Sequence, residues 1–162
     1  MLTSSVAEAA WQQAMPDEQA VAVLAAKFAR MLQTPIVIYL EGDLGAGKTT
    51  FARAYIHALG FPGYVKSPSY GLLETYEAGG QKILHLDLYR IEDPEELEYL
   101  AIRDLYRADT ALLVEWPERG KSHLPAADLL LEFGETDEAR FIRCTGFTVR
   151  GLDLAEKISS AS

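Results

Sequence analysis

Cysteine is nearly absent from this sequence. The only thiol among 162 residues, Cys144, cannot form a disulfide within the chain, and its place in an apolar alternation predicts a small buried core residue. No apolar run approaches the about 20 residues that a membrane-spanning helix requires. Residues 1–15 also lack a basic segment followed by an apolar one, which is the pattern of a secretory leader. We therefore expect a cytoplasmic protein without a membrane anchor.

Positive charge is also scarce. Lysine and arginine together number 15 against 24 acidic residues, which gives a net charge of −9, and the basic residues do not cluster anywhere along the chain. A protein that grips nucleic acid by itself needs a basic surface to displace counterions from the phosphates. We therefore expect any involvement with RNA to be indirect, through other proteins.

The composition is otherwise that of an ordinary globular protein. Apolar residues make up 49% of the sequence and charged residues 24%, and there is no internal repeat or linker. We expect residues 1–162 to form one nucleotide-binding domain, whose ends at 1–15 and 159–162 are poorly patterned. Within the first of these ends, residues 5–13 are a candidate edge strand.

The most informative stretch of the chain joins a predicted strand to a predicted helix. Residues 36–40 form an apolar run of strand length, and residues 49–59 carry apolar side chains at helical spacing. Between them lies GDLGAGKT at 42–49, a G-x-x-x-x-G-K-T motif. Its glycines let successive backbone N–H groups turn toward a polyphosphate, and the helix N-terminus adds positive dipole. We expect Lys48 to reach the β- and γ-phosphates and the Thr49 hydroxyl to ligate Mg²⁺.

Asparagine does not occur in the sequence at all, and this bears on the choice of nucleotide. GTP-binding proteins read guanine with an Asn-Lys-x-Asp segment, which this chain cannot supply. They also carry Asp-x-x-Gly after a switch strand, whereas Asp87 is followed here by Leu88, Tyr89 and Arg90. We therefore predict that the nucleotide is ATP.

Two predicted strands end in carboxylates. Residues 82–87 end in Asp87, and the apolar run 111–114 is followed by Glu115, which is the arrangement of a Walker B strand. One carboxylate should hold Mg²⁺ directly or through water, and the other could orient the attacking water. Because Trp116 stands where a second consecutive acid is usual, Asp87 is expected to supply that acid. The sequence leaves the division of roles between them open.

The remaining patterns predict a three-layer α/β P-loop domain. Hairpins favour a mixed sheet that is parallel around 36–40 and 111–114 and antiparallel toward its edges. The further expected elements are a helix from Asp17 to before Pro35, a hairpin at 72–87, a helical region from Asp93 with Leu97, Leu100, Ala101 and Leu105 as its buried stripe, strands at 129–133 and 139–145, and a helix at 152–158.

Four segments together resemble one family of small bacterial ATPases. They are GDLGAGKTT at 42–50, SPSY at 67–70, HLDLYR at 85–90 and EWP at 115–117, in the order and spacing of the tRNA threonylcarbamoyladenosine biosynthesis protein TsaE family. The resemblance extends over residues 16–145. The one departure is Ser69, where the family pattern has threonine, and the hydroxyl is kept.

This resemblance implies a Mg²⁺-dependent ATPase that assists threonylcarbamoylation of adenosine 37 in tRNAs that read ANN codons. The transferase chemistry of the family belongs to a heterodimer of TsaD-type and TsaB-type subunits, so tRNA would be contacted only through the complex. Catalytic roles are implied for Lys48, Asp87 and Glu115, and metal ligation for Thr49 and Glu115. The implied nucleotide contacts are Asp17, Gly42, Leu44, Gly45, Ala46, Gly47, Lys48, Thr49, Thr50, Ser69, Trp116 and Ala139.

Two alternative functions stay open on the sequence. A small P-loop kinase would phosphorylate a metabolite or nucleoside, and a labelled product formed without partner proteins would reveal it. A nucleotide-dependent interaction switch would need little hydrolysis. In that case an Asp87→Ala or Glu115→Ala variant would bind ATP, dock and still support modification. For the ATPase itself we expect slow hydrolysis by the isolated chain, at a rate that its partners alter.

Overall fold

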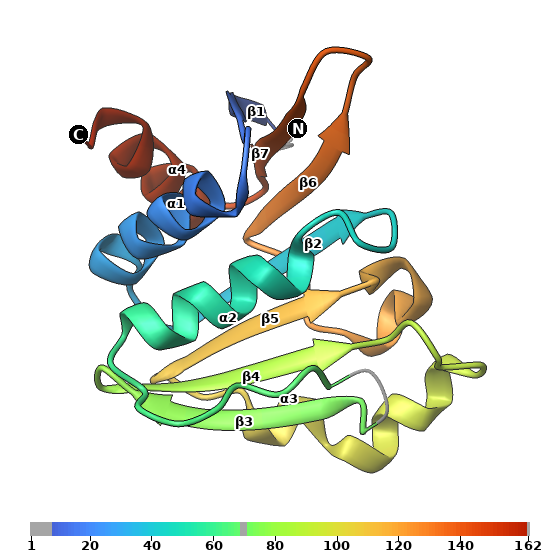
Figure 1. The fold of residues 1–162 in the computed structure, drawn as a ribbon. Coiled ribbons are helices and arrows are strands. Elements are labelled where there is room, and N and C mark those ends of the chain that lie inside the picture. The colour runs from blue at the N-terminus through green and yellow to red at the C-terminus, as the bar shows by residue number, and fades with distance from the viewer. Residues whose placement is uncertain (1–7, 69–70, 162) are drawn as a thin grey trace, which may run out of the picture.

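The computed structural model describes residues 8–68 and 71–161, which form one sheet with helices on both faces (Figure 1). The strands are β1 (Glu8–Ala14), β2 (Ile36–Gly42), β3 (Leu73–Ala78), β4 (Gln81–Asp87), β5 (Thr110–Glu115), β6 (Leu129–Glu135) and β7 (Arg140–Gly146). The α-helices are α1 (Glu18–Met31), α2 (Lys48–Ala58), α3 (Ile102–Leu105) and α4 (Val149–Ser160). The 3₁₀ helices are η1 (Pro94–Leu100), η2 (Pro117–Arg119) and η3 (Lys121–His123). The sheet order is β1-β7-β6-β2-β5-β4-β3.

The strand pairing confirms the predicted mixed sheet. At its centre β2 runs parallel to β5 and β6, and β5 runs parallel to β4. Toward the edges β3 is antiparallel to β4, β7 to β6 and β1 to β7. The short turns at 79–80 and 136–139 reverse the chain directly and so produce antiparallel neighbours, whereas β4 reaches its parallel neighbour β5 through η1 and α3.

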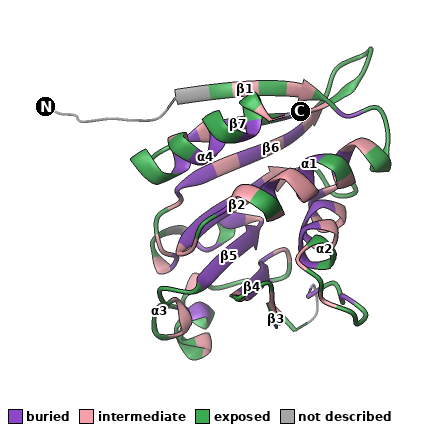
Figure 2. Ribbon diagram, turned by 90° about the vertical axis from the view of Figure 1, so that its left-hand side faces the viewer, coloured by how far each residue is buried: buried purple, intermediate pink, exposed green. Residues whose placement is uncertain are grey.

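Side chains of the central strands alternate between two apolar layers. Ile36 and Ile38 of β2 belong to the cluster that packs with α1, α2 and α4. Val37 belongs to a second cluster with Leu97 of η1 and Ile102 of α3. β5 is buried along its whole length between these layers (Figure 2). Helices therefore cover both faces of the sheet, which confirms the three-layer α/β architecture.

The parallel strands end side by side at one edge of the sheet. In the strand register Leu40 pairs with Glu115, and Asp87 also pairs with Glu115. The loop that begins at Gly42 therefore leaves β2 beside the carboxylates that close β4 and β5. In open α/β sheets this carboxyl-terminal edge is where ligands bind.

The two ends of the chain are more regular than their composition predicts. The candidate strand at 5–13 is present as β1, although residues 5–7 lie outside the described part of the chain. The C-terminal helix begins before the predicted range 152–158. It does so because the Thr148 side chain accepts a hydrogen bond from the Gly151 N–H at 3.0 Å and so caps α4.

The predicted helical region after Asp93 is divided in two. Asp93 and Pro94 start it as expected, with Asp93 as the N-cap of η1. At Ala101 the backbone turns to φ +52°, so η1 ends and α3 begins. The predicted buried stripe is therefore wrong at Ala101, which is exposed, while Ile102 is buried in its place. A 3₁₀ helix has about 3.0 residues per turn, so the 3.6-residue spacing does not hold across this region.

The buried carboxylate of Asp128 ties the start of β2 to the start of α4. It accepts hydrogen bonds from the Val37 N–H at 2.8 Å and from the Thr148 hydroxyl at 2.7 Å.

We expect Asp128→Ala to lower the free energy of unfolding by about 2–4 kcal/mol, because it leaves a buried N–H without an acceptor. Chemical denaturation measures this, with Asp137→Ala in the exposed β6–β7 turn as the control. A loss within about 0.5 kcal/mol of the control would contradict the assignment.

Candidate nucleotide-binding site

The glycine-rich loop between β2 and α2 has a shape that its glycines make possible. A Cβ at Gly42 would lie 2.6 Å from the carbonyl oxygen of Phe133 in the neighbouring strand β6. Gly47 has φ +112° and is the N-cap of α2. Side chains other than hydrogen are strained at such positions. The loop therefore approaches β6 closely and delivers its backbone to the start of α2.

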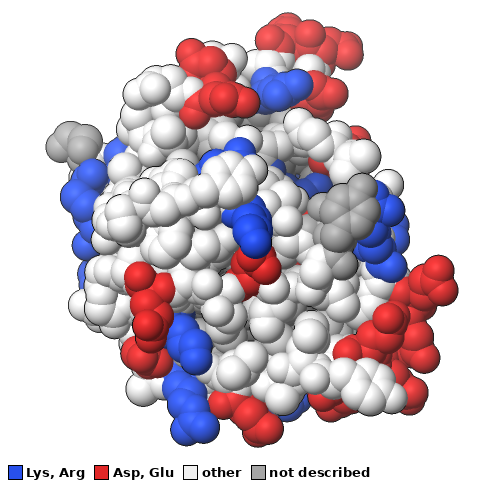
Figure 3. All heavy atoms as spheres, turned by 60° about the horizontal axis from the view of Figure 1, so that its bottom comes forward, with Lys and Arg blue, Asp and Glu red and all other residues white. Residues whose placement is uncertain are grey.

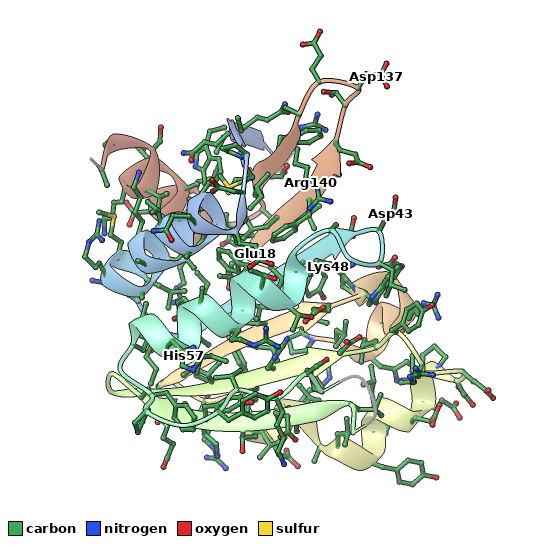
Figure 4. The ribbon with its side chains drawn as sticks, in the orientation of Figure 1. Glu18, Asp43, Lys48, His57, Asp137 and Arg140 are labelled. Atoms are coloured by element: carbon green, nitrogen blue, oxygen red, sulfur yellow. The ribbon has the colours of Figure 1, made fainter. Side chains whose placement is uncertain are left out.

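Lys48 occupies the inside of this loop (Figure 4). Its side chain is buried, and its Nζ donates hydrogen bonds to the carbonyl oxygens of Gly42 and, at 3.1 Å, of Asp43. The same ammonium lies 4.1 Å from the centre of the Trp116 ring, a cation–π contact. Burial lowers the pKa of Lys48, and the nearby Glu115 carboxylate opposes that shift. The ammonium is thus held where the loop and the strand ends meet.

Thr49 and Glu115 meet across the gap between α2 and β5. The Thr49 Oγ1 lies 2.9 Å from each carboxylate oxygen of Glu115, whose residue is 2% exposed. A hydroxyl and a carboxylate are the oxygen ligands that Mg²⁺ prefers, and Mg²⁺ sites use few protein ligands beside substrate phosphates and water. The described residues contain no group of three or more His, Cys, Asp or Glu side chains that could hold a metal by themselves. The donor set therefore fits Mg²⁺ bound together with a nucleotide.

Asp87 stands beside this pair at the end of β4. Its residue is 5% exposed, and its Oδ1 accepts a hydrogen bond from the Tyr89 N–H at 3.0 Å. Burial raises the pKa of Asp87, and the adjacent Glu115 charge raises it further, while His85 and Lys48 oppose the shift. Two carboxylates and one ammonium are thus brought together in a poorly hydrated place.

These groups line a cavity of about 300 Å³. Its size is at the lower end of the range for small-molecule sites. The predicted site residues that line it are Leu44, Gly45, Ala46, Gly47, Lys48, Thr49, Thr50, Asp87, Glu115 and Trp116. Ser67, from the SPSY segment that carries part of the family resemblance, lines it as well, whereas Ser69 lies outside the described residues.

A second cavity, of about 240 Å³, lies against the same loop. It shares residues 45–47 and Thr50 with the first cavity, and it is lined further by residues 15–17 and by residues of α1, β6 and β7. Among these is Asp17, the N-cap of α1, whose carboxylate accepts a hydrogen bond from the Ala20 N–H at 2.8 Å. Arg140 lines this cavity from the start of β7 (Figure 4), whereas its predicted neighbour Ala139 is in the exposed turn. The same loop therefore lines both cavities.

Sequence reasoning left some of these residues without a role in the site. Tyr89 and Arg90 line the first cavity, and the Tyr89 ring packs 5.0 Å from the Trp116 ring. The feature that could have identified them is their place directly after the carboxyl end of β4, because ligands bind at that edge of such sheets. His85 was missed in the same way, since it appears in the sequence as one polar residue in a buried strand. Its Nε2 lies 2.7 Å from the Glu115 Oε2.

The sheet order, the glycine-rich loop and the strand-end carboxylates define an α/β protein of the P-loop NTPase class. The family model described as "Threonylcarbamoyl adenosine biosynthesis protein TsaE" matches residues 15–142. This chain belongs to the TsaE family.

Individual relatives agree with that assignment. The protein of Haemophilus influenzae named tRNA threonylcarbamoyladenosine biosynthesis protein TsaE is 42% identical over 153 residues, 91% of this chain and 97% of its own length. The Bacillus subtilis protein of the same name is 35% identical over 151 residues, 92% of each chain. The crystal structure of YdiB from Bacillus subtilis superposes with a TM-score of 0.79 at 25% identity, covering 94% of this chain and 95% of that one. The fold and the family therefore rest on full-length similarity.

Two further observations concern helix length and surface charge. Across the two described ranges, no helix has the length and apolar character needed to cross a membrane. On the face seen in Figure 3, Lys and Arg side chains lie in small separate groups with acidic side chains between them. That face offers no continuous basic patch for a nucleic-acid backbone.

The raised pKa of Asp87 predicts a stability change in the nucleotide-free protein. The folded chain keeps this proton over a pH range in which the unfolded chain has lost it. The Asp87 contribution to the free energy of unfolding therefore falls as the pH rises from the ordinary value of 3.8 through the raised value. We expect Asp87→Asn to raise the unfolding midpoint at neutral pH, by an amount that shrinks toward pH 3.8. Thermal unfolding over this pH range measures it, with Asp137→Asn as the control, and an Asp87→Asn protein less stable than wild type at neutral pH would contradict it.

Proposed function

We propose that this chain is a Mg²⁺-dependent ATPase that acts as an accessory factor in threonylcarbamoylation of adenosine 37 of tRNAs reading ANN codons. The observation that carries this proposal is the contact between the Thr49 hydroxyl of the P-loop and the Glu115 carboxylate of β5, at 2.9 Å. These are the two positions from which P-loop NTPases hold Mg²⁺, and a metal held there would neutralise phosphate charge. The pathway comes from the names of the relatives.

Three charged side chains of the first cavity, Lys48, Asp87 and Glu115, have tasks in such a reaction. Lys48 and the backbone N–H groups at the start of α2 bind phosphate oxygens, and Thr49 and Glu115 hold the metal. Mg²⁺, when bound, supplies charge neutralisation for the transferred phosphoryl group. Asp87 is adjacent to Glu115 and has a raised pKa, which suits a group that orients the attacking water and accepts its proton.

The second cavity supplies a place for the rest of the nucleotide. It is lined by the same loop and combines apolar side chains with the charged residues Asp17, Glu18 and Arg140. A base packs on apolar walls, and a ribose is bound by polar groups. With asparagine missing from the sequence, the guanine-reading segment of GTPases is unavailable, which favours adenine.

The transferase chemistry is assigned to partners. We propose that a heterodimer of TsaD-type and TsaB-type subunits carries it out in the cytoplasm and that tRNA reaches this chain only through that complex. The net charge of −9 and the mixed charges of the face in Figure 3 support an indirect contact with tRNA.

The test measures ATP turnover and tRNA modification together over several cycles, with the cognate heterodimer and with wild type or Lys48→Ala. We expect Lys48→Ala to lower both rates by about 10²–10³-fold, because one preorganised charge at the transition state is removed. Lys157→Ala, which removes an exposed lysine paired with Asp153 on α4, is the matched control.

Equal modification by wild type and Lys48→Ala would overturn the proposal. A labelled small-molecule product formed without the heterodimer would instead identify a kinase. Modification that is sustained by variants that bind but do not hydrolyse ATP would identify a nucleotide-dependent switch.

The same site predicts that one substitution can weaken Mg²⁺ binding without weakening nucleotide binding. Thr49→Val keeps the shape of the side chain and removes the hydroxyl ligand. We expect the affinity for a fluorescent ADP analogue without Mg²⁺ to change less than about 3-fold, and the enhancement of that affinity by Mg²⁺ to fall by about 10-fold. Fluorescence titration with and without Mg²⁺ measures both quantities. A Thr49→Val protein with the wild-type response to Mg²⁺ would remove Thr49 from the metal site.

A further inference from the structure

His85 is a buried polar side chain to which the proposed reaction gives no role. It lies in β4 between Ile83 and Asp87, at alternate positions of one face of the strand, and Ile83 packs in the cluster beneath α2. The exposed fraction of His85 is 0%. Its Nε2 is 2.7 Å from the Oε2 of Glu115, which makes this the closest described polar contact of that carboxylate.

The other imidazole nitrogen identifies what this side chain contributes. Nδ1 of His85 is buried and has no hydrogen-bond partner among the described residues. A polar nitrogen in that condition destabilises the folded state, and an apolar side chain such as its neighbours Leu84 and Leu86 would avoid the penalty. The benefit of the imidazole therefore lies at Nε2. This nitrogen carries the proton and donates a hydrogen bond to Glu115, because a proton on Nδ1 would be a buried donor without an acceptor.

This hydrogen bond bears on how the Glu115 carboxylate is oriented. Glutamate has several rotatable bonds, so a ligand at a strand end needs a partner that fixes its plane. His85 binds Oε2 from β4, while the Thr49 hydroxyl is within 2.9 Å of both oxygens from the side of the P-loop. Oε1 is left facing Thr49 without a contact to the imidazole in the described structure. A group that hydrogen-bonds to a metal-ligating side chain commonly sets the orientation and basicity of that side chain.

We propose that His85 is a positioning residue for the metal: it holds Glu115 by Oε2, so that this carboxylate and the Thr49 hydroxyl are aligned for Mg²⁺ before nucleotide binds. The inference rests on the proposed Mg²⁺–nucleotide site and goes beyond it, since His85 is not among the described residues that line the cavity. It predicts that the coupling between Mg²⁺ and nucleotide depends on a hydrogen-bond donor at this position.

Two polar substitutions distinguish a role of His85 as hydrogen-bond donor from a role in filling space. In His85→Gln the side-chain amide nitrogen reaches about as far as Nε2 and still donates to Glu115. In His85→Asn the amide is one methylene closer to the backbone and falls short. Both variants bury a side-chain amide at this position, so the penalty of burying a polar amide falls on both.

The measurement is the affinity for a fluorescent ADP analogue, mant-ADP, titrated without Mg²⁺ and at increasing Mg²⁺. We expect His85→Asn to raise the half-saturating Mg²⁺ concentration by about 10-fold, while the affinity without Mg²⁺ stays within about 3-fold of wild type. His85→Gln is expected to stay within about 3-fold of wild type in both quantities. Circular dichroism melts of each variant verify that the proteins compared are folded.

His123→Asn is the matched control. His123 also binds a carboxylate, with its Nδ1 at 2.8 Å from the Glu98 Oε1, but this pair is at the surface. This variant removes a histidine–glutamate contact of similar length, 2.8 Å against 2.7 Å, and is expected to leave the response to Mg²⁺ unchanged.

The outcomes distinguish this inference from the function on which it rests. A wild-type response to Mg²⁺ in His85→Asn would overturn the positioning role, and so would an equal loss in His85→Asn and His85→Gln. If Mg²⁺ did not enhance mant-ADP binding by wild type, the proposed metal-dependent nucleotide site itself would fail. If His85→Asn does not fold, the response of His85→Gln decides: a half-saturating Mg²⁺ concentration about 10-fold above wild type would overturn the positioning role, and a value within about 3-fold would support it.

Discussion

The carboxylate of Glu115 is the group around which the site is built. It closes β5, the strand that is buried along its whole length, and is met there by Thr49 from the P-loop and by His85 from β4. Each partner comes from a different element, so the contact exists only when β2, β4 and β5 end in register and α2 starts beside them. The topology of the sheet and the chemistry of the site therefore impose the same constraint.

This arrangement suits the binding of a charged ligand, and it does not stabilise the nucleotide-free chain. Burial lowers the pKa of Lys48 and raises that of Asp87, so both charged forms are less favourable here than in water. A ligand that brings phosphate charge and a divalent cation would compensate these groups and would stabilise the fold by mass action. Buried charges at functional sites commonly carry this kind of penalty.

Local patterns in the sequence determined much of this structure. The P-loop, the hairpins and the carboxylates at 87 and 115 were predictable because turn residues, alternation and strand ends are local signals. The break at Ala101 was not, because the left-handed turn that inserts Ile102 into the core is decided by packing against the sheet. The positions of His85, Tyr89 and Arg90 depend on which strands become neighbours, and no spacing within one strand reveals that.

The central claim is that Thr49 and Glu115 form a metal-dependent site for an adenine nucleotide. Isothermal titration of the wild-type chain with a non-hydrolysable ATP analogue, with and without Mg²⁺, tests it most directly. We predict one site per chain, an affinity that Mg²⁺ increases by about 10-fold or more, and weaker binding of the matching GTP analogue. An affinity indifferent to Mg²⁺, or equal for the two nucleotides, would contradict it.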